Sequence, residues 1–406
     1  MYNNPPKNWK IYKLKELYDI KRGGSPRPIE KFLTTDPDGI NWIKIGDAKI
    51  DSKYIEETKE KITLEGAAKS RFVEEGDFIL SNSMSFGRPY IMKTRGCIHD
   101  GWLVLKERQD GLIFKDFMYY ILSSENVYSQ FKNAAAGGVV RNLNIQRVEN
   151  VIVPIPPTLE EQQEIVQVLD TMSDIIRRRK ECISQAQDLI PALFQEMFKN
   201  YENNTILLSS ICDIKGGKRL PSGEKLIDAK TEHPYLRVTN FKNQNIDMND
   251  IKYITEDVYK KISRYVITTG DIYISIAGTI GLVGDIPNEL NNANLTENAA
   301  RLIIDKKKVN KKYLIYCLNS TFLQQQIKEA TVGVGVPKLA LSRIGTLKIY
   351  LPDIKIQEQF AQKAIEIEAY IKEQQEELAN AKQMFQSLLH HAFTGELTRK
   401  KYGGSK

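Results

Sequence analysis

The strongest constraint on the fold of this 406-residue chain is an internal repeat that runs through the whole sequence. Four stretches of the first half recur, in the same order, in the second half. The offset between paired stretches stays between 193 and 196 residues, which predicts two copies of one structural unit. The pairs are LKELYDIKRGGSP (14–26) with LSSICDIKGGKRLP (208–221), WIKIGDAK (42–49) with YLRVTNFK (235–242), FVEEGDFILSNS (72–83) with YVITTGDIYISI (265–276), and AGGVVRNLN (136–144) with VGVGVPKLA (332–340).

Each copy reads as a β-rich globular part followed by one long helix. Short runs such as NWIKIG, DFILS, YLRVT and DIYISI are alternating or β-branched, and Gly, Asn, Asp and Pro separate them. One helix per copy interrupts these strands, over 114–131 and 309–327, where apolar residues recur at helical spacing. The predicted fold class is therefore α+β, with two β-rich domains of the same kind.

The long helices carry the clearest periodicity. Apolar residues follow alternating steps of four and three from Ile165 to Met197, and again from Phe360 to Ala392. Such heptad patterns predict that the two helices pack on each other as an antiparallel coiled coil. A proline, Pro191, lies inside the first pattern and is expected to kink or restart that helix near residue 190.

Each heptad pattern has one polar position, Arg179 in the first helix and Gln374 in the second. In an antiparallel pair these two fall in adjacent central layers, where polar residues can fix the register. We expect Arg179 to be satisfied by Gln374, or by Glu373 or Glu376 at the edge. The predicted domains are 1–157 (first globular domain), 158–200 (central long helix), 201–352 (second globular domain), 353–398 (distal long helix) and 399–406 (flexible tail).

Several stretches give this ordered arrangement a family resemblance. PPTLEEQQEI, the closing LLHHAFTGELTRK (388–400), and the loops GDFILSNSMSFGR and GDIYISIAGTIGLVG resemble the specificity subunit of type I restriction-modification systems. The resemblance covers nearly the whole chain. It implies two target-recognition domains, each reading one half of a split double-stranded DNA sequence, and two helices that act as a spacer.

The same resemblance implies the partners. The helices would dock two modification subunits, which bind S-adenosylmethionine and methylate adenine, and restriction subunits that use ATP and Mg²⁺ can join them. The chain itself would be non-catalytic and carry no cofactor. Two rival interpretations remain open: a self-sufficient restriction endonuclease or methyltransferase, and a coiled-coil scaffold without a role in DNA binding.

Composition is compatible with this interpretation. The net charge of +7 permits an anionic partner without requiring one. The four cysteines are far apart and form no CxxC pair, which favours reduced thiols in a cytoplasmic protein. No run approaches the roughly 18 apolar residues of a membrane span, and the polar start MYNNPPKNWK does not resemble a signal peptide.

Two stretches imitate catalytic motifs. NNPPK (3–7) contains the Asn-Pro-Pro of adenine methyltransferases, but Lys7 stands where an aromatic residue would stack on a flipped base. PDGINWIKIGDAK carries Asp38, Asp47 and Lys49 in the pattern of a metal-dependent nuclease. The second copy has Asn240 in place of Asp47, so we expect a turn or recognition role instead.

The candidate DNA contacts are basic and polar residues of the repeated loops, because Lys and Arg bind phosphates while Arg, Lys, Asn, Gln, Ser and Thr read base edges. The second copy has no equivalent of Arg88, so the two domains should read different half-sites. The run RRRK (177–180) is either a solvated helix face or a contact to the DNA spacer backbone. The candidates are Lys21, Arg22, Arg27, Lys44, Lys49, Ser81, Asn82, Ser83, Arg88, Arg141, Asn142, Lys215, Lys218, Arg219, Arg237, Asn240, Lys242, Ser275, Thr279 and Lys338.

Overall fold

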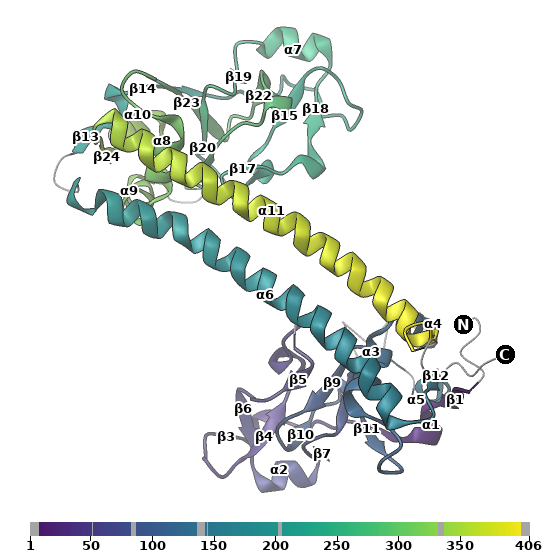
Figure 1. Cartoon of the computed structure of the whole chain (residues 1–406). Coiled ribbons are helices and arrows are strands. Elements are labelled where there is room, and N and C mark those ends of the chain that lie inside the picture. Colours follow the sequence, from purple (N-terminus) through teal and green to yellow (C-terminus); the bar gives the residue numbers. More distant parts are fainter. Residues whose placement is uncertain are drawn as a thin grey trace. The chain divides into compact units, whose positions relative to one another are not determined.

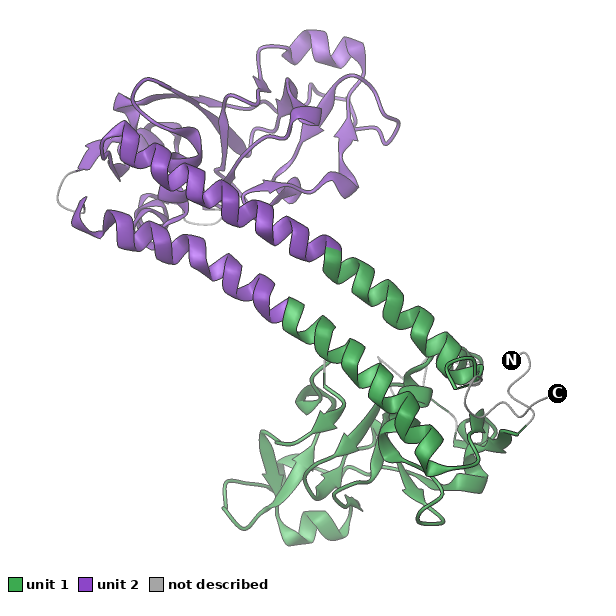
Figure 2. Ribbon diagram, in the orientation of Figure 1, with its two compact units in different colours: residues 1–179, 377–406 green, residues 180–376 purple. Residues whose placement is uncertain are grey.

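The computed structural model describes residues 8–50, 52–82, 87–135, 143, 145–201, 205–331 and 337–398. It divides into two compact units, unit 1 (residues 1–179 and 377–406) and unit 2 (residues 180–376), as Figure 2 shows. Each unit contains one β-rich globular part and a segment of each long helix. The predicted tail, 399–406, lies outside the described residues.

In unit 1 two five-stranded sheets form the globular part (Figure 1). The first has the strand order β2 (Tyr18–Arg22), β11 (Trp102–Glu107), β8 (Phe78–Ser81), β9 (Pro89–Met92), β5 (Tyr54–Ile55). The second has the order β3 (Leu33–Thr34), β6 (Glu60–Ile62), β4 (Ile40–Ile43), β10 (Gly96–Ile98), β7 (Arg71–Val73). A separate antiparallel pair joins β1 (Lys10–Lys13) to β12 (Ile152–Ile155). The helices are α1 (Leu14–Leu17), α2 (Leu64–Ala68), α3 (Lys115–Ser123), α4 (Glu125–Ala135) and α5 (Ile145–Glu149), with 3-10 turns η1 (Ile29–Lys31) and η2 (Ile45–Asp47).

Unit 2 repeats this plan with shorter sheets. One sheet has the order β14 (Cys212–Gly216), β23 (Ala299–Ile304), β20 (Ile272–Ser275), β21 (Val283–Gly284). The other has the order β18 (Lys252–Tyr253), β15 (Pro234–Leu236), β22 (Ala293–Leu295), β19 (Val266–Ile267). Two pairs are separate, β13 (Thr205–Leu207) with β24 (Lys348–Tyr350), and β16 (Phe241–Lys242) with β17 (Asn245–Ile246). The helices are α7 (Glu256–Ile262), α8 (Lys311–Asn319), α9 (Thr321–Ala330) and α10 (Leu341–Gly345), with 3-10 turns η3 (Lys199–Tyr201), η4 (Leu208–Ser210), η5 (Val238–Asn240), η6 (Met248–Asp250) and η7 (Asn288–Leu290).

The two copies share their strand pairings. The run β2-β11-β8-β9 corresponds to β14-β23-β20-β21, and the pair β1–β12 corresponds to β13–β24. The parallel pair β4–β10 has its counterpart in β15–β22. This repetition confirms the predicted α+β fold with two domains of one kind.

The single helix expected in each globular part is in fact two helices. In the first copy α3 ends at Ser123 and α4 begins at Glu125; in the second α8 ends at Asn319 and α9 begins at Thr321. The serine between them is responsible, because the Oγ atoms of Ser124 and Ser320 accept the N–H groups of Val127 and Leu323 at 3.4 Å. Such caps start a new helix in place of continuing the old one.

The long helices are α6 (Leu159–Phe198) and α11 (Ile354–Phe393). Helix α6 is continuous through Pro191, so the expected restart near residue 190 does not occur. In unit 1 Ile165, near the start of α6, shares a hydrophobic core with Ala392, at the end of α11. In unit 2 Phe194 of α6 lies against Phe360 of α11, with ring centroids 5.3 Å apart. The start of one helix thus meets the end of the other in both units, which confirms the antiparallel arrangement.

A buried glutamine ties each long helix to its globular part. The Oε1 atom of Gln162 accepts the N–H of Phe114 at 2.7 Å, and its Nε2 donates to the carbonyl of Leu112 at 3.1 Å. Gln357, 195 residues later, accepts the N–H of Asn310 at 2.9 Å and donates to the carbonyl of Lys308 at 3.3 Å. Because both side chains are fully buried, the glutamines fix the start of each long helix against the loop before α3 or α8.

A tyrosine and a lysine make a second attachment in each copy. The Tyr120 hydroxyl donates to Asp170 of α6 at 2.5 Å, and Lys53 pairs with the same carboxylate at 3.0 Å. In unit 2 the Tyr316 hydroxyl donates to Glu368 of α11 at 2.7 Å, and the Lys312 ammonium lies 2.9 Å from that carboxylate. These contacts join each globular part to one long helix.

The polar position of the first heptad pattern is engaged within unit 1. The guanidinium group of Arg179 forms an ion pair with Glu377 of α11, one position beyond the Glu376 named from the sequence.

In the described part of the chain, no helix combines the length and apolar character needed to cross a membrane.

Candidate nucleic-acid interface

The glycine turn that follows β2 or β14 is built the same way in both copies. The Gly23 N–H donates to the carbonyl of Trp102 at 2.9 Å, and the Gly217 N–H donates to that of Ala299 at the same distance. A Cβ atom at either glycine would lie 2.1 Å from a backbone oxygen, that of His99 or of Thr296. Only glycine allows this approach. The turns carry exposed basic residues, which are Lys21, Arg22 and Arg27 in unit 1 and Lys215, Lys218 and Arg219 in unit 2.

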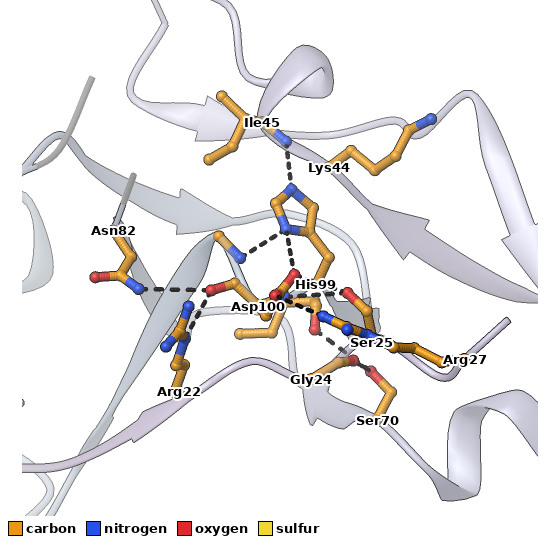
Figure 3. A network of polar contacts seen from close by, with 12 residues as sticks. Arg22, Gly24, Ser25, Arg27, Lys44, Ile45, Ser70, Asn82, His99 and Asp100 are labelled. Carbon is orange, nitrogen blue, oxygen red and sulfur yellow. Dashed lines mark hydrogen bonds and ion pairs between the residues drawn. The ribbon is translucent and has the colours of Figure 1, made fainter. Parts of the chain in front are cut away.

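One carboxylate lies behind each of these turns, as Figure 3 shows for the first copy. Asp100 accepts the Ser25 hydroxyl at 2.9 Å and lies 3.9 Å from the Arg27 guanidinium. In the second copy Arg219 pairs with Glu297 at 2.6 Å. Burial raises the pKa of Asp100, but the Ser25 hydrogen bond and neighbouring positive charge outweigh this and hold the pKa below its ordinary value. The pKa of Glu297 is lowered in the same way, with Arg219 outweighing burial.

His99 occupies the centre of the network in Figure 3. Its Nδ1 atom lies 2.7 Å from the N–H of Gly101, and its Nε2 atom lies 3.1 Å from the N–H of Ile45. Burial lowers the pKa of His99, and the Asp100 carboxylate opposes this without overcoming it. A neutral imidazole has a single acceptor nitrogen, so at most one of these two N–H groups is bonded at a time, whereas an imidazolium could accept neither. His99 therefore fixes the turn around η2 to the β10–β11 connection in its neutral form.

Asp47 and Asn240 occupy the same position in the two copies and close the same turn. Asp47 accepts the backbone N–H of Lys44 at 2.8 Å, and Asn240 accepts that of Arg237 at 2.9 Å. An amide oxygen can replace a carboxylate oxygen in this role, which explains the exchange between copies. Asn240 is buried, so its side chain is not available to contact DNA.

Two of the three candidate serines, Ser81 and Ser275, also have a structural role. Ser81 accepts the N–H of Arg88 through its hydroxyl at 2.9 Å, and Ser275 accepts the N–H of Leu282 at 2.8 Å. Both serines are buried, and so is Asn82. In this conformation the three side chains are closed to a partner, and we leave them out of the interface as well.

The remaining candidates differ in exposure and pairing. Arg88, Lys49, Thr279 and Lys338 are exposed. Lys44 and Arg237 are half-buried, and each pairs with an acid: Lys44 with Glu60, and Arg237 with Asp250 at 2.8 Å. Lys242 is exposed and pairs with Asp247 at 2.5 Å. The candidates Ser83, Arg141 and Asn142, and the NNPPK stretch, lie outside the described residues.

The sequence analysis missed the residues behind the turns, namely His99, Asp100 and Glu297. Asp100 and Glu297 follow equivalent strands but are different acids, and the stretches around them, IHDGW and LTENA, share no residue at the same place. Aligning the copies on strands β10 and β22 would have paired the two acids.

Across the residues that the structure describes, no three metal-ligating side chains gather into a potential cation site.

Comparisons with known proteins agree with this architecture. The sequence matches the family described as type I restriction modification DNA specificity domain twice, over residues 6–185 and 200–379. It is 22% identical to the type I restriction enzyme MjaVIII specificity subunit of Methanocaldococcus jannaschii, over 95% of this chain and 92% of that protein. It is 24% identical to the EcoBI specificity subunit of Escherichia coli, over 72% of this chain and 68% of that protein.

Two solved structures share the fold. The crystal structure of a type I restriction-modification S subunit from M. genitalium superposes with a TM-score of 0.54 at 18% identity, covering 96% of this chain and 97% of that one. A chain from a structure describing complex assembly and conformational transition of the type I restriction-modification system gives a TM-score of 0.66 at 17% identity, covering 96% and 99%. With two matches that span most of its length, the chain belongs to the type I restriction-modification DNA specificity family.

Proposed function

We propose that this chain is the DNA-specificity subunit of a type I restriction-modification complex. One observation carries the proposal: two domains present the same glycine turn, backed by a carboxylate and bearing exposed cations, and each domain is anchored to a long helix by a buried glutamine. Residues 1–157 and 201–352 are the two target-recognition domains, and the helices over 158–200 and 353–398 are the spacer. Two readers on one spacer suit a bipartite DNA site.

The partners follow from the family. The helices dock two modification subunits, which hold S-adenosylmethionine and methylate adenine. Restriction subunits that use ATP and Mg²⁺ join that complex, which works in the cytoplasm. The chain contributes recognition and no chemistry of its own. A self-sufficient nuclease is disfavoured because Asp47, the acid of the nuclease-like stretch, closes a turn that Asn240 closes equally well.

The exposed DNA contacts we propose are the side chains on the open side of the repeated turns and loops. They combine phosphate-binding cations with groups that can read base edges. They are Lys21, Arg22, Arg27, Lys49, Arg88, Lys215, Lys218, Arg219, Lys242, Thr279 and Lys338, with Lys44 and Arg237 at the edge.

The experiment is to express the chain with its modification subunit in a methylation-free host and to sequence the methylome. We expect methylated adenine in one split motif, and no methylation when either protein is omitted. Methylation of the same motif by the modification subunit alone would show that this chain is not the subunit that recognises the DNA sequence. A motif without a gap would contradict the assignment of two separate readers.

Arg88 offers a sharper test of the first domain. The backbone N–H of Arg88 donates to the Ser81 hydroxyl, and in the second copy the backbone N–H of Leu282 donates to the Ser275 hydroxyl. Leucine is therefore the replacement that the repeat itself offers at this position. Arg88→Leu should keep the loop and remove one base contact, at a cost of about 1–3 kcal/mol in discrimination at one base pair. The methylome of the variant should show one relaxed base in one half-site. An unchanged motif would show that Arg88 does not contact a base.

A further inference from the structure

A cavity of about 380 Å³ opens beside the glycine turn of unit 2. Three cationic residues are among those that line it, Lys215, Arg264 and Arg301. Backbone of the Gly216–Gly217 turn, with Tyr265, Val266 and Leu295, forms the rest of the lining. The cavity lies wholly within the second globular part, at the ends of strands β14, β19, β22 and β23.

The charges in this cavity are poorly balanced. Arg301 donates to the carbonyl of Val266 at 2.6 Å and lies 3.6 Å from the buried carboxylate of Asp271. Within the described residues, neither Lys215 nor Arg264 forms an ion pair. Three cations therefore share one carboxylate, and two of them lack a counter-charge.

The strand register makes the arrangement costly without a ligand. Lys215 and Arg301 are directly opposite each other in the antiparallel β14–β23 pair, so their side chains share one face of the sheet. Like charges in this position destabilise a sheet. A local arrangement that opposes folding is expected where it serves a function, and here an anion between the cations would remove the repulsion.

The first copy does not reproduce this set of cations. Its strand register places Val104 opposite Lys21, where the second copy has Arg301 opposite Lys215. Lys21 is already neutralised by Asp19, 2.5 Å away. Arg71, which corresponds to Arg264, donates to the carbonyl of Arg22 at 3.4 Å. The accumulation of unpaired positive charge belongs to the second domain.

We propose that this cavity holds one phosphodiester group of the DNA backbone, clamped by Lys215, Arg264 and Arg301. The inference rests on the proposed function and adds to it that the second domain grips the backbone more strongly than the first. The backbone N–H of Gly217 is already used, since it donates to Ala299. The side chains therefore supply the binding, and Arg264 and Arg301 join the interface.

The test measures DNA binding of the full chain in complex with its modification subunit, over a range of salt concentrations. The probes are a duplex that carries the methylated motif and an unrelated duplex. Lys215→Ala and Arg264→Ala should each weaken binding to both duplexes alike, by about tenfold at low salt. Each should also flatten the slope of log affinity against log salt by about one unit.

Matched variants isolate the cavity from general charge loss. Lys307→Ala removes an exposed cation of the same domain outside the cavity and should leave binding within about twofold. Lys21→Ala should weaken binding less than Lys215→Ala does, because Asp19 already screens Lys21. Arg301 is left in place, since its removal would strand the buried Asp271 carboxylate.

A second measurement identifies the ligand. A set of duplexes each carries a single neutral methylphosphonate at a different position of the second half-site. At one position the neutral group should weaken binding by the wild type and leave binding by Lys215→Ala unchanged. The clamp is overturned if both cavity variants bind with wild-type affinity and salt slope while the complex still methylates its split motif. It is also overturned if the loss is confined to one base pair with an unchanged slope. Absence of any split motif in the wild type would instead refute the proposed function itself.

Discussion

At the scale of single residues, the pair Asp47 and Asn240 shows how the repeat separates structure from function. Both accept a backbone N–H three residues earlier and close a 3-10 turn. The second oxygen of Asp47 faces the N–H of Lys59 at 3.4 Å, whereas the Nδ2 of Asn240 donates to the carbonyl of Asp250 at 3.0 Å. Each side chain fits the polarity of its surroundings, so the acid is there for the turn.

This comparison predicts the effect of removing the acid. Asp47→Asn should keep the turn and the methylation activity at a small cost in stability, because its Nδ2 would face the N–H of Lys59. Asp47→Ala should cost more and lower the free energy of unfolding by about 1 kcal/mol. In assembled complexes, methylation and cleavage rates with Asp47→Ala should stay within a few-fold of the wild type. A loss of about a thousandfold with DNA binding intact would point to a metal site at Asp47.

His99 makes the first domain sensitive to acid. Its pKa is lower in the folded chain than the ordinary value of 6.5, so below that pH the unfolded state binds more protons than the folded state. Stability contributed by neutral His99 is complete above pH 6.5 and is lost as pH falls through that value toward the folded pKa. The equivalent residue of the second copy is Thr296, which does not titrate.

The measurement is chemical unfolding of the wild type and of His99→Gln at a series of pH values. The free energy of unfolding of the wild type should fall relative to that of the variant as the pH drops below about 6.5. Using the difference between the two proteins cancels the other titrating groups. Parallel pH profiles would show that His99 does not experience the environment described.

At the scale of elements, the repeat, the long helices and their antiparallel pairing could all be predicted, because periodicity and a constant offset survive in the sequence. The loops could not be read in the same detail. Ser81, Ser275 and Asn240 are typical DNA-contacting residue types, yet tertiary hydrogen bonds turn them inward. A polar loop residue that closes a turn looks the same in sequence as one that faces a ligand.

Some structural signals were in the repeat but were not used. Gln162 and Gln357 recur at an offset of 195, and the structure makes them the anchors of the long helices. Ser124 and Ser320 recur at an offset of 196 and divide the expected helix of each copy into two. Residues that are identical between divergent copies can mark shared structural contacts even when their chemistry is ordinary.

The glutamine anchor yields a prediction for stability. Gln357→Ala leaves the N–H of Asn310 and the carbonyls of Lys308 and Pro352 without their partner. We expect the free energy of unfolding to fall by about 3 kcal/mol. Gln362→Ala, an exposed position of the same helix, is the control and should cost less than about 0.5 kcal/mol. Equal effects in denaturant unfolding would show that the buried amide does not anchor the helix.

For the molecule as a whole, we propose that the paired helices set the gap between the two half-sites. In unit 1 Arg179 of α6 pairs with Glu377 of α11, and in unit 2 Phe194 of α6 contacts Phe360 of α11. Counting four residues along each helix from the Arg179–Glu377 pair, we expect Ile183 of α6 to lie near Glu373 of α11. Adding one heptad at each of these points keeps the apolar seam intact, since the pattern repeats every seven residues.

Methylome sequencing of cells that carry this double insertion, after Ile183 and after Glu373, measures whether the helices set the spacer length. Seven residues of helix add about 10 Å at ~1.5 Å per residue, which corresponds to about three base pairs at ~3.4 Å each. We expect both half-sites to keep their bases while the spacer between them becomes longer by about three base pairs. Full methylation at the original spacer would contradict it, because the helices would then not determine the distance between the half-sites.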